Sequence, residues 1–145
     1  RGDYFAESSF AKQIAMIEAG MIPPIIKHGN LDSMRTIADV RDAVRAYHML
    51  LTVEPKPGEV YNIGGAHSCR IEDVLAELCR LAGIRPTLCE DRERMRPIDA
   101  DNQIPDCTKF KEVTGWAPSI PFTQTMSDLL EYWRERIKRY PTLQR

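Results

Sequence analysis

The sequence predicts an α/β fold in which helices outweigh strands and the strands are short. Apolar residues recur at helical spacing in five segments of the 145-residue chain, whereas the strand-like segments are three to five residues long and lie far apart. Proline and glycine separate these segments, most clearly at Pro23-Pro24 and at Pro57-Gly58. Strands this short do not build a large sheet of their own, so such a fold is suited to packing against another domain.

The first two helices are expected over residues 8–20 and 39–51. A Ser8 or Ser9 cap begins the first helix, and Gly20 marks its end. The buried stripe of the first helix is expected to consist of Phe10, Ile14, Ile17 and Met21. Asp39, or a neighbouring residue, begins the second helix, and Asp39, Arg41 and Asp42 then form its charged first turn. Its buried side is expected to consist of Val40, Val44, Tyr47 and Leu51.

Three further helices are expected in the second half of the chain. One precedes Gly83, which closes it, and a short one over 108–113 stops at Gly115. The last helix covers roughly 122–140. The inward-facing residues of the first and last of these are expected to be Ile71, Val74, Leu75, Leu78 and Leu81, and Met126, Leu129, Leu130, Trp133 and Ile137.

Four short strands are expected between these helices. They cover residues 25–28, 34–37, 59–63 and 87–89, each flanked by turn-forming residues. Gly64-Gly65 follows the third strand, where glycine allows the chain to turn with a positive φ.

Composition and charge give no indication of a nucleic-acid or membrane partner. The net charge is −1 and the sequence pI is about 6.4, so no concentrated basic face indicates a nucleic-acid partner. No apolar run approaches the ~20 residues that cross a bilayer, so no membrane partner is expected and a cytoplasmic protein is predicted. The four cysteines, spaced by 9, 9 and 17 intervening residues, match no zinc or disulfide pattern and are interpreted as reduced thiols.

The chain contains no recognisable catalytic machinery. It lacks the Gly-rich fingerprint of a dinucleotide-binding turn, a P-loop and a Tyr-x-x-x-Lys pair. The three histidines lie far apart in the sequence, so no metal site is predicted. We therefore expect no catalytic, cofactor-binding or metal-binding residue in these 145 residues.

A few cationic residues at the edges of expected elements suit an anionic ligand. Arg35, on a short strand, can present a planar guanidinium to two phosphate oxygens, although a surface arginine is the simpler interpretation. Arg96 precedes a proline, and Asp99 follows three residues later, so a cation and a hydroxyl acceptor can share one rim or form a plain surface pair. Lys12, on the first helix, is either a ligand or a solvated lysine.

Five segments, in order, resemble the C-terminal half of a known enzyme family. They are SSFAKQIAMIEAG, GNLDSMRTIADVRDAVRAYHMLL, GEVYNIGG, RMRPID and TGWAPSIPFTQTMSDLLEYWRERI. They are similar to the extended short-chain dehydrogenase/reductases, the NAD-dependent epimerase/dehydratase family, that act on nucleotide sugars. The resemblance implies that residues 1–145 are the C-terminal substrate-binding part of such an enzyme, with the Rossmann core largely missing. It also implies that a preceding Rossmann domain binds NAD(P) and carries the catalytic tyrosine.

The resemblance assigns a role to each cationic position. Arg35 and Arg96 match arginines that contact the diphosphate, and Asp99 matches the acidic residue that holds the nucleotide ribose. Lys12 matches a basic residue near the base and phosphates. The implied substrate-binding residues are thus Lys12, Arg35, Arg96 and Asp99.

Within that family, the segment DVRDAVRAYHMLL favours the reductases of GDP-4-keto-6-deoxy-mannose over GDP-mannose 4,6-dehydratases. The implied reaction is hydride transfer from NAD(P)H to the C4 keto group of the GDP-bound deoxyhexose. The alternatives are the dehydratase, another nucleotide-sugar epimerase or reductase, or, from a different class, a standalone non-catalytic binding domain. The expected partners are a GDP-deoxyhexose, the chain's own N-terminal Rossmann domain and a second copy in a homodimer, and this half alone is expected to be inactive.

Overall fold

The computed structural model describes residues 4–53, 56–95 and 102–140. Within these ranges the helices exceed the strands, as predicted. In chain order the elements are α1 (Ala6–Glu18), β1 (Ile25–His28), β2 (Met34–Ile37), α2 (Val40–Thr52), β3 (His67–Arg70), α3 (Ile71–Ala82), β4 (Thr87–Glu90), the 3-10 turn η1 (Arg92–Arg94), β5 (Asn102–Gln103), α4 (Thr108–Thr114) and α5 (Phe122–Arg139). No helix among these residues has both the length and the apolar character needed to cross a membrane.

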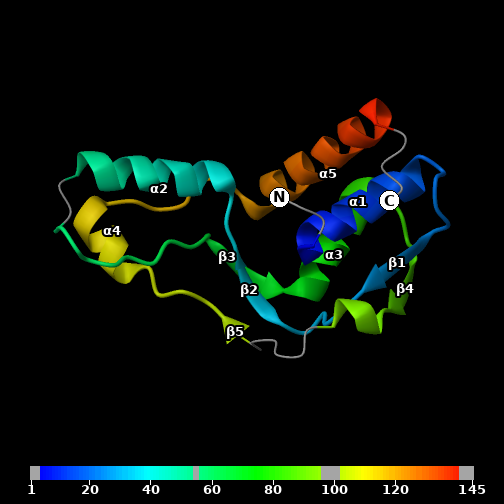
Figure 1. The fold of residues 1–145 in the computed structure, drawn as a ribbon, viewed down its shortest axis with the longest axis horizontal. Coiled ribbons are helices and arrows are strands. Elements are labelled where there is room, and N and C mark those ends of the chain that lie inside the picture. The colour runs from blue at the N-terminus through cyan, green and yellow to red at the C-terminus, as the bar shows by residue number, and fades with distance from the viewer. Residues whose placement is uncertain (1–3, 54–55, 96–101, 141–145) are drawn as a thin grey trace.

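The molecule is elongated, with two separate buried clusters (Figure 1). The larger cluster joins α1, α3 and α5 with β1, and its fully buried side chains include Ile14, Ile26, Leu78 and Leu130. The smaller cluster lies at the other end, where α2 and α4 run side by side, and consists of Ala46, Phe110 and Trp116. The predicted inward faces of α3 and α5 are confirmed, with Leu81 and Leu129 only partly buried.

Helix α1 begins earlier than the sequence predicted. Phe5 is its N-cap residue, so the expected Ser8 or Ser9 cap is wrong. Both serines lie inside the helix and are buried, where Ser8 Oγ accepts a hydrogen bond from Trp133 Nε1 at 3.1 Å. The predicted end is confirmed, because the N–H of Gly20, at φ +68°, bonds to Ile17 O, as expected for a left-handed helix terminus.

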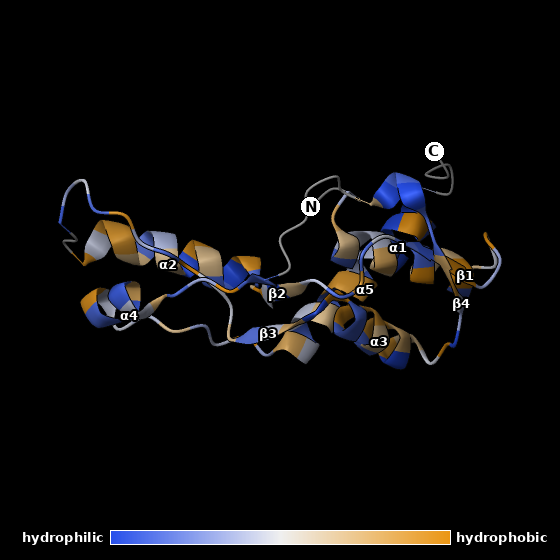
Figure 2. Ribbon diagram, turned by 90° about the horizontal axis from the view of Figure 1, so that it is seen from below, coloured by the Kyte–Doolittle hydropathy of each residue, from blue (hydrophilic) through white to orange (hydrophobic). Residues whose placement is uncertain are grey.

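Helix α2 buries a different face from the one predicted. The stripe of Val40, Val44, Tyr47 and Leu51 is exposed by 71%, 58%, 59% and 86%, so the predicted buried side is wrong. Asp42 and Ala46 are buried instead. Ala46 packs with Phe110 of α4 and with Trp116, whereas Asp42 faces the loop before α5. Figure 2 shows hydrophobic residues recurring along α2. The described residues therefore leave one apolar face of α2 uncovered.

The strands form two small sheets. β1 pairs with β4 in parallel, and β2 pairs antiparallel with β3 and parallel with β5. The predictions for β1, β2 and β4 are confirmed, but β3 and β5 were not predicted. Residues 59–63 form no strand, because no described segment pairs with their backbone. Strand propensity alone does not supply that pairing partner.

Gly64 and Gly65 are required for close packing rather than for a turn. Neither has a positive φ, so the predicted positive-φ turn is wrong. A Cβ on Gly65 would lie 1.7 Å from the carbonyl oxygen of Ile37, and one on Gly64 would lie 2.7 Å from Pro105. These two glycines let the chain after residue 63 cross directly over the end of β2.

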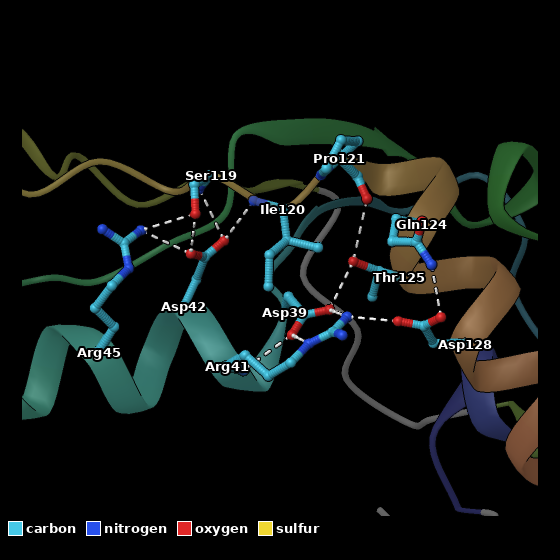
Figure 3. A network of polar contacts seen from close by, with 10 residues as sticks. All are labelled: Asp39, Arg41, Asp42, Arg45, Ser119, Ile120, Pro121, Gln124, Thr125 and Asp128. Carbon is cyan, nitrogen blue, oxygen red and sulfur yellow. Dashed lines mark hydrogen bonds and ion pairs between the residues drawn. The ribbon is translucent and has the colours of Figure 1, made fainter.

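Asp39 connects the start of α2 to α5 (Figure 3). Its carboxylate accepts hydrogen bonds from the backbone N–H of Arg41 at 2.9 Å and from the Arg41 guanidinium at 2.8 Å. The Thr125 hydroxyl of α5 donates to it at 2.9 Å. Arg41 also donates to Asp128 of α5 at 2.7 Å. The predicted cap at Asp39 is confirmed, and this cap fixes the end of β2 relative to α5.

Asp42 performs a second linking role one turn along α2. It is 3% exposed and accepts hydrogen bonds from the backbone N–H groups of Ser119 and Ile120, both at 3.0 Å. The Ser119 hydroxyl and the Arg45 guanidinium donate to its other oxygen. The sequence placed Asp42 only in a charged first turn, whereas the structure makes it the anchor of the loop that precedes α5.

Acid is expected to destabilise the protein through these two aspartates. The Arg41 side chain lowers the pKa of Asp39 far below its usual 3.8, against the opposing effect of burial. Burial alone would raise the pKa of Asp42, but hydrogen bonds from Arg45, Ile120 and Ser119 outweigh it and keep that pKa low. A depressed folded-state pKa gives stability that is present above the unfolded value and is lost as the pH falls below it.

We therefore expect the free energy of unfolding to fall as the pH decreases from about 5 toward 2. The measurement is urea unfolding as a function of pH, compared with Asp39→Asn. This variant keeps a helix cap but lacks the charge, so it should be about 1–2 kcal/mol less stable at neutral pH and show a shallower acid dependence. Identical pH profiles for the two proteins would contradict this account.

The four cysteines are free thiols, as the spacing predicted. Cys69 is buried on β3, and burial raises the pKa of its thiol above the usual value. Burial also raises the pKa values of Cys79 and Cys107. These thiols are protonated at neutral pH and pack as small apolar side chains.

Candidate functional site

A cavity of about 810 Å³ lies among the described residues, where several chain segments meet. Its walls come from the start of α1, the end of β1 and the loop after it, β2, η1 and β5. The polar and charged side chains in these walls are Glu7, Ser9, Lys27, His28, Asn30, Ser33, Arg35, Thr36, Asp91, Glu93, Arg94 and Gln103. The cations Lys27, Arg35 and Arg94 stand beside the carboxylates Glu7, Asp91 and Glu93, so the lining is strongly polar and of mixed charge.

The parallel pairing of β1 and β4 creates one wall of the cavity. His28 and Glu90 are paired at the carboxyl ends of the two strands, so the chain leaves both strands at the same edge. Gly29 then passes very close to η1, because a Cβ there would lie 2.4 Å from the carbonyl oxygen of Arg94. Only glycine permits this approach, which brings the loop after β1 against η1.

The loop between β1 and β2 is held by its own polar side chains. Asn30 Oδ1 accepts from the backbone N–H of Asp32 at 2.9 Å, and Asn30 Nδ2 donates to Ser33 Oγ at 2.8 Å. Such side-chain turns fix the backbone without help from a helix or a sheet. The stretch Gly29–Ser33 therefore enters β2 in a defined direction and places Arg35 at the cavity.

Arg35, which the sequence predicts as a ligand for an anion, is one of the residues that line the cavity. It is half-buried in the middle of β2, opposite Cys69 of β3 and Gln103 of β5. Its Nη1 donates to the carbonyl oxygen of Met34 at 2.7 Å. This contact restricts the motion of the guanidinium at the cavity wall.

The other predicted ligands are not brought to Arg35 by the described residues. Lys12 does not line the cavity, and its Nζ lies 5.6 Å from the ring centroid of Trp133. Arg96 and Asp99 lie outside the described residues, and in the sequence they follow Met95, which lines the cavity. The roles of Lys12, Arg96 and Asp99 thus remain predictions from the sequence.

Several cavity residues were not identified from the sequence. Arg94 on η1, His28 at the end of β1 and Gln103 on β5 all line the cavity. Arg94 belongs to a run of charged residues, and this pattern is typical of a solvent-exposed segment. No local signal distinguishes these residues, because the cavity forms only when strands distant in sequence pair.

Gly64 and Gly65 do not form the glycine turn of a dinucleotide-binding site. A bound pyrophosphate needs backbone N–H groups at a glycine turn that leads into a helix. Gly64 and Gly65 do not form such a turn, since Pro105 and the backbone of Ile37 fill the space beside them. No step that requires NAD(P) is therefore assigned to residues of this chain.

Comparison with known proteins identifies the family. The family model described as GDP-mannose 4,6 dehydratase matches residues 1–129. The chain belongs to this family. The resemblance to the C-terminal part of the extended short-chain dehydrogenase/reductases, inferred above from five motifs, is thereby confirmed.

Individual members of the family are similar along nearly the whole chain. GDP-6-deoxy-D-mannose reductase of Pseudomonas aeruginosa is 28% identical over 136 residues, which cover 94% of this chain and 44% of that protein. GDP-mannose 4,6 dehydratase 2 of Arabidopsis thaliana is 26% identical over 145 residues, which cover 99% of this chain and 38% of that protein. This chain thus spans less than half the length of either relative.

A solved structure of the family has the same fold. The structure of RMD from Pseudomonas aeruginosa complexed with NADPH matches 94% of this chain and 44% of that chain, with a TM-score of 0.86 and 27% sequence identity. The predicted α/β fold with short strands is therefore confirmed.

Proposed function

We propose that this chain is the substrate-binding part of a nucleotide-sugar oxidoreductase that reduces the C4 keto group of GDP-4-keto-6-deoxy-mannose with NAD(P)H. The observation that carries the proposal is the position of Arg35 in a polar cavity, in a chain similar over 94% of its length to a GDP-6-deoxy-D-mannose reductase. A planar guanidinium there matches the charge and shape of a diphosphate.

The role of these residues is to bind and orient the nucleotide sugar. Arg35 holds the diphosphate, and in the sequence Arg96 and Asp99 extend the same site along the diphosphate and toward the ribose. NAD(P) and the proton-donating tyrosine belong to a preceding half of the protein, since the relatives are more than twice as long as the matched region. The chain alone therefore binds the substrate but does not reduce it.

The exposed stripe of α2 is the surface on which that preceding half docks. Val40, Val44, Tyr47 and Leu51 present four large apolar side chains on one helix face, and each is more than half exposed. Residues 59–63 lie beside α2 and α4 with strand-forming side chains but no pairing partner among the described segments. An apolar helix face next to an unpaired extended segment is suited to completing the core of another domain.

Replacing Leu51 with aspartate tests this docking. Leu51 is 86% exposed, so the substitution should cost less than about 0.5 kcal/mol if no other segment covers it. If the preceding half covers it, burial of the leucine is lost and the complete protein should be destabilised by about 2 kcal/mol. Urea unfolding of the complete protein measures this change in the free energy of unfolding.

Leu88→Asp is the matched control. Leu88 is also an exposed leucine, but it lies on β4 at the opposite end of the molecule (Figure 1). We expect this variant to unfold nearly like the unaltered protein. If Leu51→Asp and Leu88→Asp lower the free energy of unfolding by the same small amount, the preceding half does not cover this face of α2.

The experiment that tests the proposed function uses the complete gene product. Its mass should be roughly twice that of the present chain, and it should oxidise NADPH only when GDP-4-keto-6-deoxy-mannose is present. Formation of that ketone from GDP-mannose, a dehydration with no net consumption of NADPH, would instead identify the dehydratase. A product no longer than the present chain, with neither activity, would favour a non-catalytic binding domain.

A further inference from the structure

Arg94 faces the same cavity as Arg35 from a different wall. Arg35 reaches the cavity from β2, and Arg94 reaches it from η1, directly after β4. The close approach of Gly29 to the carbonyl oxygen of Arg94 fixes the backbone of η1 at this point. Two guanidinium groups from separate elements thus line one polar cavity.

The Arg94 side chain is held in place by a chain of hydrogen bonds that ends in β1. Its Nη1 donates to Ser9 Oγ at 2.8 Å, and the buried Ser9 also accepts from Gln13 Nε2 at 3.3 Å. Gln13 in turn binds both backbone groups of Lys27, accepting from its N–H at 2.8 Å and donating to its carbonyl oxygen at 3.0 Å. These contacts connect η1, α1 and β1 around the cavity.

A neighbouring carboxylate completes the fixation of Arg94 without using all its donors. Arg94 Nε lies 3.4 Å from Asp91 Oδ2, and Asp91 is itself occupied, because its other oxygen caps the N–H of Glu93. Within the ranges that the structure describes, Arg94 Nη2 has no hydrogen-bond partner. A guanidinium has five N–H donors in a rigid plane, so Arg94 retains donors in a fixed orientation.

We propose that Arg94 is a second phosphate ligand of the site, which binds one phosphate of the nucleotide diphosphate while Arg35 binds the other. This inference rests on the proposed function, since it names a residue of the same substrate site. Binding costs little conformational entropy at Arg94, because Ser9 and Asp91 already restrict its side chain. The role of Ser9 is to position Arg94, not to contact the substrate.

The test is binding of GDP and of guanosine to the complete protein, measured by calorimetry, for Arg94→Ala and Arg94→Gln. Both variants should bind GDP about tenfold more weakly. Their affinity for guanosine, which has no phosphate, should be unchanged. The glutamine side chain of the Arg94→Gln variant still offers an amide N–H to Ser9, so this variant separates loss of the charge from loss of the link to α1.

Two further variants complete the design. Ser9→Ala removes one of the two restraints on Arg94 and leaves Asp91, so GDP binding should weaken by a few-fold and guanosine binding should not change. Arg94→Lys keeps the charge and should recover part of the GDP affinity lost in Arg94→Ala.

The outcomes separate this inference from the proposed function. If Arg35→Ala weakens GDP binding but Arg94→Ala and Arg94→Gln do not, Arg94 is only a structural link and the inference is overturned while the function stands. An equal loss of affinity for GDP and for guanosine would also overturn the inference, because it would indicate a distorted cavity. Failure of the unaltered protein to bind GDP would overturn the proposed function and the inference together.

Discussion

Alanine at position 35 is expected to raise the dissociation constant for GDP roughly 10- to 100-fold in the complete protein. Arg35 is half-buried on β2, lines the cavity and is restrained by Met34 O. A hydrogen bond to a charged group contributes about 1.5–3 kcal/mol. Calorimetric titration with GDP measures the change.

Arg85→Ala is the control for this prediction. Arg85 is exposed between α3 and β4 and does not line the cavity, so its removal should leave GDP affinity nearly unchanged.

Arg96→Ala is expected to weaken GDP binding as strongly as Arg35→Ala, on the basis of the Arg-Pro-x-Asp motif. Unchanged affinity in both Arg35→Ala and Arg96→Ala would refute the assignment of the site.

Alanine at position 42 is expected to lower the free energy of unfolding by about 3 kcal/mol. The buried carboxylate of Asp42 accepts from the backbone N–H groups of Ser119 and Ile120, from the Ser119 hydroxyl and from Arg45 (Figure 3). Its removal leaves two backbone donors without an acceptor at the loop before α5. The loss should be visible as a lower urea midpoint with an unchanged slope.

Asp128→Ala is a suitable comparison for Asp42→Ala. Asp128 lies on α5, and its side chain is 42% exposed where it pairs with Arg41. An exposed ion pair of this kind contributes at most about 1 kcal/mol, so the second variant should remain close to the unaltered protein. Similar losses in the two variants would show that burial of Asp42 adds nothing to the stability of the loop.

Local signals predicted most helix positions correctly. Asp39 caps α2, and Gly83 and Gly115 end α3 and α4 with φ near +67° and +68°. Each of these features depends on a few adjacent residues, which is why the sequence is enough to place them. The misplaced start of α1 has the opposite explanation, because Ser8 and Ser9 bond to Trp133 and Arg94, which lie far away in the sequence.

The errors concern contacts that no local pattern specifies. The stripe Val40, Val44, Tyr47 and Leu51 has the spacing of a buried helix face, but spacing does not tell which chain segment covers it. Residues 59–63 have strand-forming side chains, yet a strand exists only when a neighbour pairs with it. The described residues supply neither a cover for the α2 stripe nor a strand partner for residues 59–63.

The sequence by itself determined the helix-rich α/β class, the family and Arg35 as a ligand candidate, because these depend on spacing and motifs along the chain. Only the tertiary structure decided that Arg94 shares a cavity with Arg35, that Gly29 and Gly65 are close-packing residues, and that Asp42 anchors the loop before α5. The physical reason is that the cavity and the anchors are made by segments tens of residues apart. Their positions depend on strand pairing and packing, which involve the whole chain at once.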